Sequence, residues 1–184
     1  MPPCVEENAN HAAAGVRGVL ADRVLLGTVQ GEHVHWRLMF VEQGRFEPEP
    51  EQQVELTAHA EPFSWEDGEH DRASIRLSTA AAVLYWSPPE PITGAVTVVG
   101  SVWEDHHAGV PEDFPVTAAV IRRLRVETRE YTEDPPHSGG WVRFGSTASY
   151  RDVSMSPKRF AGPAADIGPA RAETGVLAHL EITA

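Results

Sequence analysis

The sequence predicts an all-β protein with little helix, arranged as a small barrel or sandwich of short antiparallel strands. Apolar and polar residues alternate in several short segments, and a period of two residues is typical of half-buried strands. Stretches containing glycine or proline separate these segments at short intervals. No segment sustains the apolar period of 3.6 residues that marks an amphipathic helix. Together these three observations favour an all-β fold.

The first β unit is expected over residues 15–87, after a flexible arm at residues 1–14. Its clearest strand is residues 33–42, where apolar and polar side chains alternate along the whole segment. One face of that strand carries Val34, Trp36, Leu38 and Phe40, and the other carries His33, His35, Arg37 and Met39. Residues 16–29, interrupted at Asp22-Arg23, are expected to form one or two strands. The other expected strands are residues 53–60 and 73–79, with residues 80–86 able to continue the last of them.

The second β unit is expected over residues 92–184, after the segment Ser87-Pro88-Pro89-Glu90-Pro91, which stops regular structure. Its expected strands are residues 92–103, 114–131, 141–150 and 175–182. Ser156-Pro157 is expected to start a short helical turn at residues 158–160, because proline suits the first helical position. The sequence leaves open whether the proline-rich segment separates two units in tandem or joins strands of one continuous domain.

The two faces of the strand at residues 114–131 differ in chemistry. We expect one face to be apolar, with Val116, Ala118, Val120, Leu124 and Val126. The opposite face then carries Arg123, Arg125, Glu127, Arg129 and Tyr131. This assignment points Arg122 inward, so a β-bulge or a polar contact is expected near it.

Composition excludes several classes of protein. The 184 residues include 15 Lys and Arg against 27 Asp and Glu, and the resulting net charge of −12 disfavours nucleic-acid and anionic-membrane partners. Cys4 is the single cysteine, so no intrachain disulfide and no cysteine-based zinc site can form. No export signal and no apolar run of about 20 residues is present. We therefore expect a soluble, cytoplasmic protein.

An acidic loop with two histidines is the first candidate site. It follows the strand at residues 92–103 and contains Glu104, Asp105, His106 and His107. Imidazole and carboxylate groups that converge can bind zinc, manganese or iron, and His33 and His35 share a strand face that could add ligands. The sequence therefore offers a candidate site for a divalent metal. The alternative is a solvated hairpin loop in which the carboxylates raise the proton affinity of the histidines.

Three resemblances rest on short motifs. Asp105-His106-His107 resembles the signature of the Asp-His-His phosphoesterases, but their upstream aspartate motifs are missing here. The Gly27-x5-His33-x-His35 spacing resembles the opening of the cupin motif, which then needs a glutamate four or five positions after the second histidine; Glu42 lies seven away. Residues 102–131, an acidic His-His loop followed by an arginine-rich strand, look like uncharacterised actinobacterial proteins, which implies no known activity.

The arginine face of the 114–131 strand is the second candidate site. Small barrels such as the OB fold bind single-stranded nucleic acid with basic grooves and stacking aromatic residues. Arg123, Arg125 and Arg129 with Tyr131 fit that pattern, and Trp103 could line a binding surface. The alternative is that these arginines pair with carboxylates on neighbouring strands.

The function hypotheses follow from motifs that are missing as well as from those present. The sequence has no Gly-x-Ser-x-Gly elbow, Walker loop, dinucleotide fingerprint or His-Glu-x-x-His motif. We therefore expect a non-enzymatic binding or interaction module without a cofactor, whose partner is a protein or a small molecule. A metal-binding protein or metal-dependent enzyme using His106 and His107 is the alternative. An OB-like nucleic-acid binder using Arg123 and Arg125 is the third hypothesis.

Overall fold

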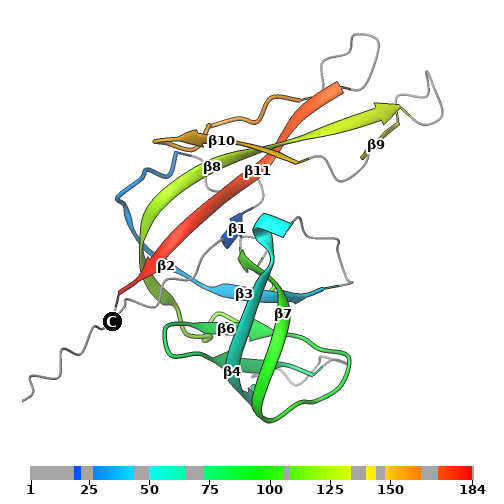
Figure 1. The fold of residues 1–184 in the computed structure, drawn as a ribbon. Helices are drawn as coiled ribbons and strands as arrows, with labels where there is room; N and C mark the ends of the chain where they lie inside the picture. Colours follow the sequence, from blue (N-terminus) through cyan, green and yellow to red (C-terminus); the bar gives the residue numbers. More distant parts are fainter. Residues whose placement is uncertain are drawn as a thin grey trace, which may run out of the picture.

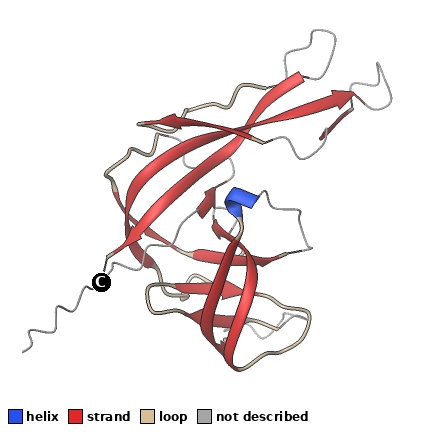
Figure 2. Cartoon of the chain, in the orientation of Figure 1, coloured by secondary structure: helices blue, strands red, loops and turns tan. Residues whose placement is uncertain are grey.

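The all-β prediction is confirmed by the structure, a computed structural model (Figure 2). It describes residues 19–21, 27–43, 50–64, 73–105, 108–133, 140–143, 148–162 and 170–183. The strands in these ranges are β1 (Val19–Ala21), β2 (His33–Trp36), β3 (Leu38–Glu42), β4 (Val54–Pro62), β5 (Ile75–Ser78), β6 (Val83–Trp86), β7 (Gly94–Glu104), β8 (Thr117–Glu133), β9 (Trp141–Arg143), β10 (Ser149–Val153) and β11 (Ala170–Ile182). A 3₁₀ turn, η1 (Pro50–Gln52), precedes β4.

Five strands close into a barrel, drawn in the lower part of Figure 1. The circuit runs from β4 through β5, β6, β3 and β7 and returns to β4. All of these pairings are antiparallel except β3 with β6, which run parallel with Phe40 opposite Trp86. Closure leaves the barrel without a free sheet edge, which removes a common cause of aggregation.

A second sheet arches above the barrel in Figure 1 and is dominated by the long antiparallel ribbon of β8 and β11. The other edge of β8 is covered successively by β2, β10 and β9. The short strand β1 pairs with β11 on one side and with β7 on the other. It thereby joins the upper sheet to the barrel through continuous backbone hydrogen bonding.

One apolar core runs through both parts of the molecule. It includes Leu38, Leu77 and Leu84 from barrel strands together with Leu124 and Val176 from the ribbon, all fully buried. The segment at residues 87–93 joins β6 to β7, and both strands belong to the barrel. A smaller cluster of Tyr85, Val110 and Phe114 packs the loop at residues 108–116 onto the barrel.

The predicted alternation in residues 33–42 is confirmed, but the segment forms two strands. Val34, Leu38 and Phe40 are buried, whereas His33 and His35 are exposed. The strand divides at Arg37 because β2 pairs with β8 while β3 pairs with β6 and β7. The carbonyl of Arg37 accepts a hydrogen bond from the backbone N–H of Asp105 instead.

Residues 80–86 do not continue the preceding strand, because the chain reverses at Thr79. The Oγ1 atom of Thr79 accepts hydrogen bonds from the N–H groups of Ala81 at 3.1 Å and Ala82 at 2.8 Å. Such side-chain bonds stabilise tight turns and interrupt a strand. β5 and β6 therefore form an antiparallel hairpin.

The expected bulge near Arg122 is confirmed, but the phase assigned to the N-terminal part of β8 was wrong. The register with β11 shifts there, since Ile121 faces Leu180 and Arg123 faces His179. An extra residue on one strand reverses which side chains point inward. Before the bulge, the side chains in the main core cluster are consequently Ala119 and Ile121, whereas Val116 is 50% exposed. Val120, also predicted to face inward, is 6% exposed but lies outside that cluster.

The predicted helical turn at residues 158–160 was also wrong, because these residues form a bend without helix. Ser156 is held in an extended pairing: its N–H donates to the carbonyl of Thr28 at 2.9 Å, and its Oγ accepts from the N–H of Thr28 at 3.0 Å. These bonds use the groups that would have capped a helix.

Within the described ranges, the structure contains no helix long and apolar enough to cross a membrane.

Candidate functional site: the arginine face and a hollow at the barrel

The structure describes four of the six residues that were predicted to bind a metal: His33, His35, Glu104 and Asp105. His106 and His107 lie outside the described residues, so the loop prediction remains a prediction. His33 and His35 are exposed on β2, opposite Val120 and Ala118 of β8. Among the described residues, no group of three or more His, Cys, Asp or Glu side chains is arranged to hold a metal ion.

Asp105 shapes the loop that follows β7. Its Oδ1 accepts the N–H of Gly109 at 2.8 Å and its Oδ2 accepts the N–H of Val110 at 3.0 Å. Ala108, directly before Gly109, has a left-handed backbone with φ of 53°. Both carboxylate oxygens are therefore engaged in holding a turn, as aspartate side chains commonly do in loops. Glu104, the other predicted acidic ligand, ends β7 and is half-buried.

The far end of this loop is held by Arg37 and by aromatic packing. Arg37 donates from Nε to the carbonyl of Phe114 at 3.3 Å and from Nη2 to the carbonyl of Glu112. The ring of Phe114 packs edge-to-face on Phe63 at 5.2 Å and on Tyr85 at 5.6 Å between ring centres. Such aromatic pairs add to the stabilisation from burial alone. The loop is thus anchored on both sides of the undescribed histidines.

The predicted arginine face exists, and its three arginines are paired with carboxylates. Arg123 forms a bidentate pair with Asp152 of β10, with N–O distances of 2.6 and 2.8 Å. Arg125 pairs with Glu51 of η1, and Arg129 pairs with Glu127 two positions earlier on β8. Pairing with carboxylates was the predicted alternative to nucleic-acid binding. Paired guanidinium groups are less available to phosphates, so the observed pairs do not favour a nucleic-acid interface.

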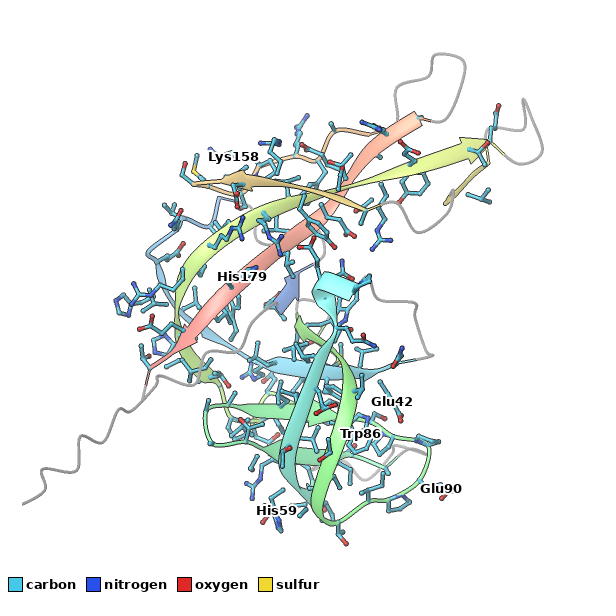
Figure 3. The ribbon with its side chains drawn as sticks, viewed as in Figure 1. Glu42, His59, Trp86, Glu90, Lys158 and His179 are labelled. Carbon is cyan, nitrogen blue, oxygen red and sulfur yellow. The ribbon has the colours of Figure 1, made fainter. Side chains whose placement is uncertain are left out.

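Arg125 lies in the middle of this face and makes two further contacts. Its guanidinium carbon stands 4.8 Å from the ring centre of Tyr150, a distance typical of a cation–π interaction. Its Nη2 donates to the Nε2 atom of His179 at 3.1 Å. His179 is labelled on β11 in Figure 3. Arg125 therefore connects the 3₁₀ turn, β10 and β11.

Glu127 is the centre of a buried polar network. It is 3% exposed, and Arg129 and Gln52 beside it are 4% and 2% exposed. One carboxylate oxygen accepts from Gln52 Nε2 at 3.0 Å and pairs with Arg129, and the other accepts from Thr174 Oγ1 at 3.0 Å. Buried charges persist when hydrogen bonds and an opposite charge compensate their lost hydration. The network therefore fixes η1 against the β8–β11 ribbon.

The partners in this network could not be found from sequence. Thr174 and Gln52 bond Glu127, Gln52 also bonds Tyr150, and the arginines of the face bond three further residues: Glu51, Asp152 and His179. They lie between 29 and 98 residues from their partners along the chain. The register between β11 and β8 shifts between Glu173 and Gly175, so Thr174 has no partner residue opposite it in the strand pairing. Its hydroxyl donates a hydrogen bond to Glu127. A cross-strand partner leaves no periodic signal in a single sequence.

Tyr131 and Trp103, the aromatic residues predicted for a binding surface, occupy different places. Tyr131 is half-buried near the end of β8, opposite Ala170 and Arg143. Trp103 is half-buried on β7, and its indole N–H donates to Ser101 Oγ at 2.7 Å. Trp103 lies opposite Met39 of β3, so it belongs to a barrel strand and not to the β8 strand that carries the arginine face.

Exposed ion pairs should make stability depend on acid pH. Hydrogen bonds from Arg76, Arg123 and Arg122 lower the pKa values of Glu61, Asp152 and Glu181, respectively, below their ordinary values. A carboxyl whose pKa is lower in the folded state contributes stability above its unfolded pKa, and the contribution disappears as pH falls through the folded pKa. We expect the urea midpoint to fall as pH is lowered from 6 to below about 4.

The measurement is urea unfolding across that pH range at low salt. Glu181→Gln should flatten the pH dependence, and Glu90→Gln, a change in the exposed β6–β7 connection, should flatten it less. Equal slopes for the wild type and Glu181→Gln would contradict the assignment of this pair.

A hollow of about 420 Å³ lies where the parallel strands β3 and β6 end. Among the residues that the structure describes, its lining includes Phe40, Glu42, Gln43, Trp86, Ser87, Pro88 and Pro89. Phe40 and Trp86, 2% and 3% exposed, meet edge-to-face with ring centres 5.9 Å apart and form a fixed floor. Figure 3 shows Glu42 and Trp86 on the same side of the barrel. This hollow was not predicted from the sequence, in which Pro88 to Pro91 indicated only a boundary between strands.

Gly100 on β7 makes this floor possible. A Cβ atom at this position would lie 2.2 Å from the carbonyl oxygen of Val41 and 2.7 Å from Cζ of Phe40. The ring of Phe40 therefore occupies space that any other residue at position 100 would need.

No family model, no curated protein and no solved structure matches the chain.

Proposed function

We propose that this protein is a non-enzymatic binding module that holds a small molecule or a short protein segment in the hollow between β3 and β6. The observation that carries the proposal is the hollow itself. Its volume of about 420 Å³ falls within the range of ligand sites, which is about 300–1,000 Å³. Its position at the end of a closed barrel is also one where ligands commonly bind.

The composition of the lining supports the same proposal. Ligand sites combine apolar walls with a few polar groups that orient the ligand. Here Trp86 and the two prolines supply apolar surface, while Glu42 and Gln43 are exposed at the rim. Since both aromatic residues of the floor are buried in the core, binding would require little rearrangement.

The cellular setting belongs to the same proposal. We place the protein in the cytoplasm, since its single cysteine can form no intrachain disulfide of the kind that secreted proteins often carry. The net charge of −12 favours partners other than nucleic acids and anionic membranes.

The test is a fragment screen by NMR on the full chain labelled with ¹⁵N. We expect a subset of fragments at millimolar concentration to shift the backbone amide signals of Gln43 and Ser87 and the indole signal of Trp86. Ser87→Trp, which fills the hollow, should abolish these shifts.

A matched control is available in a second hollow, of about 480 Å³, which includes Gln30, Arg122 and Ser154 in its lining. Ser154→Trp fills that hollow and should leave the shifts unchanged. If no fragment shifts the three signals, or if the shifts survive Ser87→Trp, the proposal is wrong.

A further inference from the structure

The chemistry of the hollow restricts the ligands that it would take. Among the described lining residues, Glu42 is the one ionisable group, and it is exposed at the rim. A second carboxylate, Glu90, lies in the connection that leaves the hollow, on the same side of the barrel in Figure 3. A carboxylate at the rim of an apolar site favours a cation and disfavours an anion.

The shape of the lining adds a second requirement. Phe40, Trp86 and Pro88 are buried and form the inner surface, whereas Glu42, Gln43 and Pro89 are exposed at the rim. Apolar surface below a polar rim suits a molecule whose apolar stem lies inside while its charged head stays at the water boundary. Lysine and arginine side chains and simple alkylamines have this form.

The charge of the whole protein acts in the same direction. With a net charge of −12, the protein attracts cations at long range and repels anions. The arginines on β8 do not offset this near the hollow, because they lie on the upper sheet and are paired with carboxylates. Long-range attraction and the local carboxylate therefore favour the same class of ligand.

We infer that the hollow binds a ligand with an ammonium or guanidinium head on a short apolar stem, the head lying against Glu42 and the stem against Trp86, Pro88 and Pro89. This inference rests on the proposed function and names the ligand class for the same site. A free amine and a basic side chain of another protein share this chemistry, and the experiment separates them.

The experiment compares matched probes by NMR titration of the full chain. Butylguanidinium and butylammonium are the cationic probes, pentanol is the neutral probe and pentanoate is the anionic probe. We expect the cations to bind about threefold more tightly than pentanol at low salt, as an exposed ion pair would give, and pentanoate to bind most weakly. Added salt should reduce the difference.

The matched variants are Glu42→Gln and Glu112→Gln. Glu112 is exposed in the loop at residues 108–116, whose backbone is held by Arg37 at the opposite end of β3. Glu42→Gln should remove the preference for cations while pentanol still binds, and Glu112→Gln should leave the preference unchanged. A capped Ala-Ala-Arg-Ala-Ala peptide that binds more tightly than butylguanidinium would assign a protein side chain, and equal binding would assign a free amine.

The outcomes separate this inference from the proposed function. If pentanol and the cations bind equally well and Ser87→Trp abolishes both, the hollow is a ligand site but the inference about charge is overturned. The inference is also overturned if Glu42→Gln leaves the preference intact. If none of the probes shifts Gln43, Ser87 or Trp86, the proposed function fails together with the inference.

Discussion

Arg129→Met is expected to destabilise the protein by about 3–5 kcal/mol, the range for breaking a buried ion pair by removing one partner. Glu127 would keep its carboxylate at a position that is 3% exposed, without the guanidinium of Arg129 that pairs with it. Gln52 and Thr174 would still donate hydrogen bonds to it, which places the loss toward the lower end of the range. Urea unfolding followed by tryptophan fluorescence gives the change in unfolding free energy.

Two further variants make this result specific to the buried charge. Glu127→Gln combined with Arg129→Met removes both charges and leaves an amide oxygen for Gln52 and Thr174, so it should be more stable than Arg129→Met alone. Arg171→Met breaks the ion pair with Glu130, in which the Arg171 side chain is 71% exposed. This change should lower the free energy of unfolding by less than about 1 kcal/mol. Similar losses for Arg129→Met and Arg171→Met would show that burial of Glu127 has no energetic consequence.

Gly100→Ala is expected to have the second large effect, a loss of about 1–3 kcal/mol, the usual cost of overpacking a core. The added Cβ would lie 2.2 Å from the carbonyl oxygen of Val41, so β7 and β3 would have to separate locally. Their pairing places Glu42 opposite Gly100, so the rim of the hollow should move as well. Thermal and urea unfolding measure the first effect, and the NMR shifts of Gln43 measure the second.

The control for this prediction is Gly162→Ala. Gly162 is exposed, and a Cβ atom added there meets no heavy atom within 4 Å. Its effect should stay within about 0.5 kcal/mol, as for ordinary surface positions. Adding Phe40→Leu to Gly100→Ala should give at most partial recovery, because it removes the ring contact but not the backbone contact with Val41. Gly100→Ala that is as stable as the wild type would contradict the close approach of the strands.

The sequence alone was sufficient to predict the all-β class and the faces of several strands. Burial alternates along residues 33–42 and 75–78 in the predicted phase, because one side of each strand faces the core. The bulge at Arg122 was also predictable, since a charged residue falls on an apolar face there. The prediction still placed Val116 in the core, because it did not carry the phase change through the bulge to the start of β8.

Only the tertiary structure decided how these strands are assembled and where a site could form. The parallel pairing of β3 with β6 brings Phe40 and Glu42 beside Trp86 and Pro88, residues more than 40 positions apart. The closure of β4 onto β7 and the pairing of the β8 arginines with Glu51 and Asp152 are likewise long-range. The alternation of apolar and polar side chains predicts which face of a strand is buried, but it does not predict which strand lies beside it. That choice is made by the packing of the whole core.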